Sequence, residues 1–216
     1  MAYIQPDGYL AVPANSNGRG VLVLHAWWGL NDTVKHFCTQ LAEFGFTCFA
    51  PDLYHGRITQ NITDAETLSR SLFADLAHPR ADLAEAVAFL AERTDQNAQG
   101  LAVIGFSLGA FFALDLSVTH PDLVRSVVVF YGTRPGDYVD AQADYLGHFA
   151  EVDEFEPQED VESLEESLKL AGLSVTFHYY EDTSHWFFEP DRKQAYNPTA
   201  AGLAWDRTLT FLEYSA

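Results

Sequence analysis

Leu101-Ala-Val-Ile-Gly-Phe-Ser-Leu-Gly-Ala110 is the stretch on which the fold prediction for this chain depends. Its first four residues are apolar and typical of a buried strand, and Ala110–Leu114 continues as helical sequence. Between them lies Gly105-Phe-Ser-Leu-Gly109, the Gly-x-Ser-x-Gly pattern of a nucleophile elbow. In such a turn the central serine has a strained backbone, and its hydroxyl stands above the sheet edge at the start of the next helix. The pattern predicts Ser107 as a catalytic nucleophile, the alternative being a plain glycine-flanked turn.

Strand-like and helix-like segments alternate on both sides of this stretch. The other expected strands are Tyr9–Pro13, Val21–Leu24, Phe46–Ala50, Ser126–Phe130, Tyr145–Phe149 and Val175–Tyr180. The other expected helices are Val34–Phe44, Asp64–Ala77, Ala81–Ala91, Val161–Leu170 and Pro198–Glu213, with Pro79 breaking the second from the third. This alternation predicts an α/β fold, a doubly wound and mostly parallel sheet with helices on both faces, in one domain over residues 1–216.

A serine hydroxyl needs a base to take its proton, and the base is expected at the carboxyl ends of the strands. The chain has eight histidines. His148 and His178 lie inside predicted strands, and His120 lies near the helix end opposite the elbow. His185 follows the last predicted strand directly, within Glu181-Asp-Thr-Ser-His-Trp-Phe187. We therefore predict His185 as the base, and a capped loop histidine is the alternative interpretation.

The base needs an acid that holds its tautomer, and in this kind of fold the chain order is serine, acid, histidine. Candidates past the strand Tyr145–Phe149 are Glu151, Asp153, Glu154 and Glu156. Asp153 is preferred because a short carboxylate on a tight turn is best held against an imidazole, although position barely separates it from Glu151. A metal site built from His148, Glu151 and Asp153 is a rival use of this cluster, but it lacks a recognised ligand spacing.

The oxyanion formed at an attacked carbonyl needs two backbone donors. One is the N–H of Leu108, the residue after the nucleophile. The other is expected in the loop after the strand Val21–Leu24, where the Trp27 N–H is the candidate. Trp28 beside it is predicted to present an aromatic wall to the substrate, with core packing as the alternative for both tryptophans. Tyr131, which directly follows a predicted strand, is a further candidate for contacting the substrate.

Composition excludes several classes of function. The chain has 216 residues and a formal net charge of −19, which argues against nucleic acid as a partner because phosphate binding needs clustered lysine and arginine. It has no apolar run long enough to span a membrane and no signal peptide at its start, so a cytoplasmic location is expected. Cys38 and Cys48 are predicted to be reduced and buried. A monomer is the default expectation, and a homodimer through an edge strand or a helix is the alternative.

With these residues in hand, the chain resembles the dienelactone hydrolase family of α/β-hydrolases over nearly all of its length. The segments that carry the resemblance are Val23–Asn31, Ala50–Tyr54, Gly105–Gly109, His148–Asp153 and Ser184–Phe187, with the tail segments Pro190–Arg192, Ala195–Pro198 and Ala204–Leu209. Carried over position by position, the resemblance implies Ser107 as nucleophile, Asp153 as acid and His185 as base. It thereby favours Asp153 over Glu151.

Two departures from the founding members of that family bear on chemistry. Those members carry a cysteine at the position of Ser107 and a glutamate at the position of Ala26 that hydrogen-bonds the resting thiol. A thiol needs such an activation switch, whereas a serine is served by its histidine directly. The founding enzyme also binds a carboxylate-bearing lactone through arginines, one of them just after the catalytic histidine. That position falls near Phe188-Glu189 here, and a glutamate would repel such a substrate.

Arg57 and Arg134 are the arginines expected in loops at the catalytic end of the sheet, and either could compensate for this charge. The sequence thus predicts a cofactor-free and metal-free serine hydrolase that acts on a small-molecule carboxylic ester or lactone through an acyl-enzyme intermediate. A catalytically silent binding protein of the same fold is one alternative. A peptidase or thioesterase with the same triad is another, because the sequence does not distinguish the leaving group.

Overall fold

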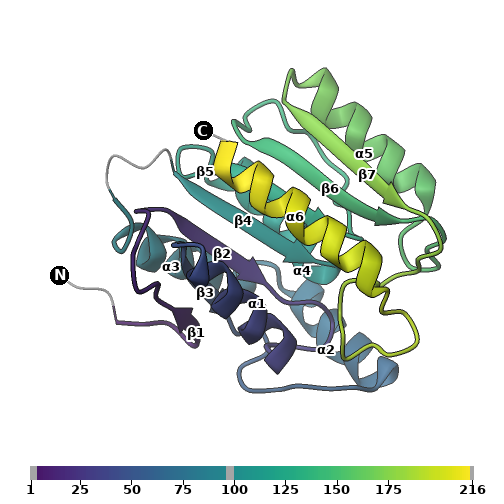
Figure 1. Ribbon diagram of the computed structural model, residues 1–216, viewed down its shortest axis with the longest axis horizontal. Coiled ribbons are helices and arrows are strands. Elements are labelled where there is room, and N and C mark those ends of the chain that lie inside the picture. Colours follow the sequence, from purple (N-terminus) through teal and green to yellow (C-terminus); the bar gives the residue numbers. More distant parts are fainter. Residues whose placement is uncertain (1–3, 96–99, 215–216) are drawn as a thin grey trace. The chain divides into compact units, whose positions relative to one another are not determined.

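The computed structural model describes residues 4–95 and 100–214 (Figure 1). The chain divides into two compact units, Met1–Val103 and Ile104–Ala216. The boundary falls within one strand, β4 (Leu101–Phe106), so the strand that leads into the predicted nucleophile begins in unit 1 and ends in unit 2.

In unit 1, two strands pair with β3 (Thr47–Pro51), one on each side. β1 (Gly8–Ala11) runs antiparallel to β3, with Gly8 opposite Pro51. β2 (Gly20–Leu24) runs parallel to β3 on its other side, with Val21 opposite Cys48. All residues of β2 and β3 are buried, as expected for strands that are covered on both faces.

Helices cover both faces of β3 because successive side chains of a strand point to opposite sides. Phe49 packs its ring 4.8 Å from that of Phe89 on α3 (Ala77–Ala91). Cys48 lies on the other face, beside Cys38 of α1 (Asp32–Glu43). Both cysteines are free and buried, as predicted, and burial raises the pKa of the Cys38 thiol to about 12.

The break between the next two helices differs from the predicted one. α2 (Ile62–Ala74) ends before Asp75, and α3 begins at Ala77, so Pro79 lies inside the first turn of α3 instead of ending a helix. A proline is tolerated there because the first N–H groups of a helix have no intrahelical acceptor to lose. Asn31 caps the start of α1, because its side chain accepts a hydrogen bond from Val34 N at 3.1 Å.

Unit 2 continues from the end of β4 with three parallel strands, β5 (Val124–Phe130), β6 (Asp144–Ala150) and β7 (Val175–Tyr180). Its helices are α4 (Leu108–Thr119), α5 (Gln158–Leu170) and α6 (Pro198–Tyr214).

Two residues of β6 show that α4 and α6 cover opposite faces of this part of the sheet. Tyr145 donates to Ser117 Oγ of α4 at 2.8 Å, whereas His148, an odd number of residues later, contacts Thr208 of α6. Figure 1 shows α6 in front of the strands of unit 2, with α4 behind them.

The strand order is β1-β3-β2-β4-β5-β6-β7. With the antiparallel edge strand β1 and the helices on both sides, this is the predicted α/β architecture, a doubly wound and mostly parallel sheet. Among residues 4–95 and 100–214, no helix is both long enough and apolar enough to cross a bilayer.

Candidate active site

Ser107 occupies the sharp turn between β4 and α4. Its backbone has φ 50° and ψ −112°, a conformation that side-chain-bearing residues rarely adopt. The Ser107 N–H donates to the Phe130 carbonyl at 2.9 Å, which ties the turn to the end of β5. This strained geometry is the one expected of a nucleophile elbow.

Close backbone approach explains the small residues around the turn. A Cβ atom placed on Gly105 would lie 2.3 Å from the Gly109 carbonyl oxygen. A Cβ atom on Gly132 would lie 2.5 Å from the carbonyl oxygen of Ser107 itself. A side chain at either position would push the neighbouring backbone away from the turn. The two glycines are therefore needed to hold Ser107 in this position.

His185 lies in the loop after β7 and reaches the serine. Its Nε2 is 2.8 Å from Ser107 Oγ, and only 4% of its surface is exposed. Local hydrogen bonds fix this loop: Thr183 Oγ1 donates to the Tyr180 carbonyl at 2.6 Å, and Phe187 N donates to the Ser184 carbonyl at 3.1 Å.

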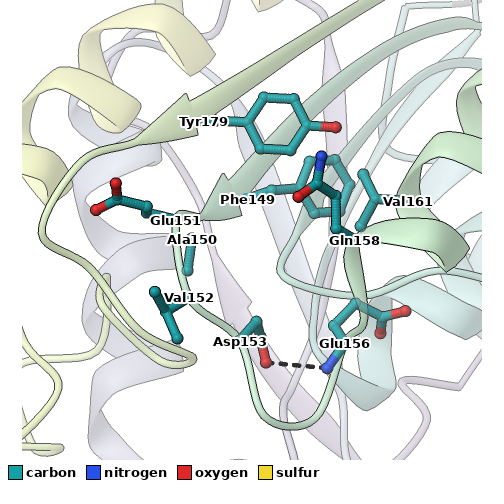
Figure 2. A pocket seen from close by; sticks show the side chains of 9 residues that line it. All are labelled: Phe149, Ala150, Glu151, Val152, Asp153, Glu156, Gln158, Val161 and Tyr179. Carbon is teal, nitrogen blue, oxygen red and sulfur yellow. Dashed lines mark hydrogen bonds between the residues drawn. The ribbon is translucent and has the colours of Figure 1, made fainter.

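Asp153 holds the opposite side of the imidazole. Its two carboxylate oxygens lie 2.7 Å and 2.9 Å from His185 Nδ1. The backbone N–H groups of Phe155 and Glu156 each donate to Asp153 Oδ1 at 2.9 Å, and Figure 2 shows the bond from Glu156. With His185 Nδ1, three nitrogen atoms contact the carboxylate. An ionised Asp153 requires a proton on Nδ1, which leaves Nε2 free to accept the Ser107 proton.

The two carboxylates that sequence position barely separated have different partners. Glu151 is exposed, and its Oε2 accepts the Asp182 N–H at 2.8 Å. His148 is also committed elsewhere, with Nδ1 2.7 Å from Tyr180 Oη and Nε2 3.0 Å from Thr208 Oγ1. Each residue of the rival metal cluster, His148, Glu151 and Asp153, is therefore hydrogen-bonded to a different protein group.

Sequence reasoning treated Glu189 as a charge that would repel an anionic substrate, and it did not foresee that this side chain is buried. Glu189 is buried, and it accepts a hydrogen bond from Tyr131 Oη at 2.9 Å. Burial raises the pKa of Glu189 to about 8, so its carboxyl is mostly protonated at neutral pH. The ring of Tyr131 packs 4.9 Å from that of His185. The sequence signal for its burial was the aromatic run Trp186–Phe188 that directly precedes it.

A cavity of about 230 Å³ borders the acid (Figure 2). Its lining residues are Phe149, Ala150, Glu151, Val152, Asp153, Glu156, Gln158, Val161 and Tyr179. Neither Ser107 nor His185 lines it, so it is not the space in which an acyl group on the serine would sit. Burial also raises the pKa of Glu156 in this wall to about 7, and its Oε1 accepts from Thr133 Oγ1 at 2.6 Å.

Comparison with known proteins identifies the family to which this chain belongs. The model of the dienelactone hydrolase family matches residues 6–215. The chain belongs to the dienelactone hydrolase family. It is a hydrolase enzyme with the α/β-hydrolase fold.

Among this family member's curated relatives, "Protein usf" of Aquifex pyrophilus is 32% identical, with 97% of this chain and 94% of the relative covered. The "Putative carboxymethylenebutenolidase" of Aquifex aeolicus (strain VF5) is 29% identical over the same shares of the two chains. A solved dienelactone hydrolase-like promiscuous phosphotriesterase from metagenomic libraries is similar in fold, with a TM-score of 0.83 and 21% identity. That comparison covers 95% of this chain and 88% of the other.

Two of the residues predicted to bind substrate in this dienelactone hydrolase family member have partners within unit 2. Arg134 forms a salt bridge at 3.1 Å with the buried Asp115 of α4, so its charge is balanced inside the protein. Tyr131 is fully buried, and its contacts include Glu189 and the ring of His185. Both therefore support the surroundings of the site, and contact with a substrate stays a prediction for each.

The predicted oxyanion donors lie in different units. Leu108 is the first residue of α4, where N–H groups have no intrahelical acceptor. Trp27 and Trp28 lie in unit 1 in the turn after β2, with Trp28 buried and its carbonyl accepting the Thr59 N–H at 3.1 Å. Arg57 is exposed in unit 1, and its Nε donates to the Tyr54 carbonyl at 3.3 Å. The roles of these residues toward a substrate stay predictions.

Proposed function

We propose that this hydrolase cleaves small carboxylic esters or lactones, with Ser107 as nucleophile, His185 as general base and acid, and Asp153 as the orienting carboxylate. The observation that carries the proposal is the continuous chain of contacts from Ser107 Oγ to His185 Nε2 and from His185 Nδ1 to Asp153. Distances of 2.7–2.9 Å along this chain suit proton transfer without rearrangement.

In the proposed acylation, His185 Nε2 takes the proton from Ser107 Oγ while the oxygen attacks the substrate carbonyl. The resulting oxyanion would be stabilised by the N–H of Leu108 and by the N–H proposed at Trp27. Collapse of the tetrahedral intermediate breaks the bond to the leaving alcohol, which receives the proton from His185. Asp153, fixed by two backbone donors, stabilises the imidazolium that exists between these two transfers.

In the proposed deacylation, the same histidine takes a proton from water, and the resulting hydroxide attacks the acyl carbonyl. The acid leaves, and the proton returns to Ser107 Oγ, which restores the enzyme. For a lactone, the leaving alkoxide stays attached to the acyl group, so the product is a single hydroxy acid. Every proton that moves is carried by His185, and the chemistry requires no redox step.

The substrate class rests on the site and on the relatives together. Carboxymethylenebutenolidase in the name of the Aquifex aeolicus relative denotes action on an unsaturated lactone. Glu189, whose charge would oppose an anionic lactone, is buried and mostly protonated at neutral pH. The charge expected to repel an anionic substrate is therefore largely absent, and neutral as well as anionic lactones belong in the test panel.

A fluorophosphonate and a chromogenic ester test the proposal. We expect the intact protein to gain the mass of one adduct on Ser107 and to hydrolyse p-nitrophenyl acetate. Ser107→Ala should lower kcat/KM by at least about 10³-fold, because the residues of such a triad act as a unit. Ser71→Ala, which changes an exposed serine of α2, is the matched control and should retain both properties.

A folded protein that takes no adduct would identify a binding protein instead of an enzyme of this mechanism. Retention of activity by Ser107→Ala within a few-fold would equally overturn the assignment. Esters, lactones, thioesters and short peptides tested side by side would then show whether the oxygen esters proposed here are the preferred class.

A further inference from the structure

A cluster of metal-ligating side chains lies in unit 1 and takes no part in the proposed reaction. His55 stands in the turn after β3, where its own φ is 51°. His78 and Asp82 lie four residues apart in α3 and therefore on the same side of that helix. The potential ligand atoms of all three lie within 4.8 Å of one another.

The distances within this cluster are too long for hydrogen bonds and suit a shared ion. Asp82 Oδ2 is 3.6 Å from His55 Nε2 and 4.0 Å from His78 Nε2. Hydrogen bonds between such atoms would be about 2.7–3.2 Å long. Ligand atoms about 2.0–2.1 Å from a tetrahedral zinc ion lie roughly 3.4 Å from one another. A small rotation of these side chains, which are partly or largely exposed, would bring both pairs to that separation.

The ligand types narrow the choice of ion. Two imidazole nitrogens and one carboxylate oxygen are typical ligands of zinc and of copper(II) or nickel(II), whereas magnesium and calcium prefer oxygen ligands alone. Zinc imposes no geometric preference of its own, so it tolerates a site completed by water on the exposed side. We propose that His55, His78 and Asp82 bind one zinc ion, with water as the remaining ligand.

Such an ion would join two segments that the chain connects only through α2. The turn after β3 is already braced by Asp52, whose Oδ1 accepts from Tyr54 N at 3.1 Å and whose Oδ2 accepts from Gly56 N at 2.6 Å. A metal bound by His55 would tie this same turn to α3. The expected consequence is greater stability of unit 1, because the ion binds the folded arrangement and the unfolded chain lacks the preformed site.

Calorimetric titration of the chelator-treated full chain, without a histidine tag, with zinc chloride tests this site. One equivalent should bind saturably, and magnesium chloride should give no such isotherm. The unfolding temperature should rise by a few degrees at saturating zinc. His78→Ala and Asp82→Asn should each weaken the zinc affinity by about tenfold or more, and circular dichroism would establish that both stay folded.

His36→Ala, which removes an exposed histidine of α1 outside the cluster, is the matched control and should bind zinc like the parent. Absence of a saturable isotherm, or equal binding by the parent and by His78→Ala, would overturn the proposal and leave solvated side chains only. The readouts are binding and unfolding temperature, so they do not depend on whether Ser107 is a nucleophile.

Discussion

Two buried histidines of unit 2, His148 and His185, differ in the groups that their ring nitrogens contact, and the proposed mechanism uses only the second. His148 lies in the middle of β6, where both ring nitrogens contact hydroxyl groups, those of Tyr180 and Thr208. His185 lies in the loop after β7, between the carboxylate of Asp153 and the hydroxyl of Ser107.

The two environments differ in the groups that they place beside a protonated imidazole ring. Burial lowers the pKa of His148 well below its usual value, and the like charges of His178 and Arg207 lower it further. Among residues 4–95 and 100–214, the hydrogen-bond partners of its ring are hydroxyl groups, which carry no charge to offset this cost. The ring of His185 is almost as deeply buried, but an anion lies 2.7 Å from Nδ1. Only the second arrangement stabilises an imidazolium during a reaction, so burial alone does not identify a catalytic histidine.

Removing His185 should give the largest effect on activity. His185→Ala takes away the group that accepts the Ser107 proton, and we expect kcat/KM for p-nitrophenyl acetate to fall by about 10⁴-fold. Steady-state kinetics on protein shown to be folded by circular dichroism would measure this loss. A decrease of less than about tenfold would mean that another group serves as base.

Changing the acid tests the same comparison from the other side. Asp153→Asn preserves the shape of the side chain but removes the anion that fixes the tautomer, and we expect a loss in kcat of about 10³-fold. Glu151→Gln is the matched control, because Glu151 accepts a backbone N–H and does not contact His185. Similar losses in the two variants would contradict the assignment of Asp153.

His148 should show the opposite behaviour to His185. His148→Ala leaves a cavity and removes the partner of two buried hydroxyls, so the free energy of unfolding should fall by roughly 2–4 kcal/mol. Urea denaturation would measure this change, and kcat at a temperature where the variant is folded should stay within a few-fold of the parent. A large fall in kcat with unchanged stability would reverse the roles assigned to the two histidines.

The buried Glu189 should make the stability of the protein depend on pH. Its folded pKa of about 8 exceeds the usual value of 4.5, so between these pH values the folded state keeps a proton that the unfolded state has lost. The stability of the parent relative to Glu189→Gln should therefore fall by a few kcal/mol as pH rises from about 4.5 to 8. Parallel stability curves for the two proteins would contradict this ionisation.

Features that depend on neighbouring residues in the chain were mostly predicted correctly from the sequence. The alternation of strand-like and helix-like segments predicted the doubly wound sheet. Pro79 was misread because a proline is compatible with the first turn of a helix as well as with its end. The prediction of one domain over residues 1–216 stays a prediction.

Long-range pairings were harder to predict, because they depend on which loops meet. Position did not separate Glu151 from Asp153, although their carboxylates point to different partners. Arg134 was a candidate for binding substrate, but it forms an ion pair with Asp115, a residue within an otherwise apolar helix. Glu189 was interpreted from the sequence as a charged group, because the burial that raises its pKa arises only in the fold.

The sequence by itself determined the glycine-flanked serine turn and the alternating elements around it, because these depend on backbone sterics and on residues close together in the chain. Only the tertiary structure decided which carboxylate meets His185, which histidine has hydroxyl partners alone, and which acidic group is buried. Those outcomes depend on contacts across dozens of residues, and the resulting desolvation and hydrogen bonds set the proton affinity of each group.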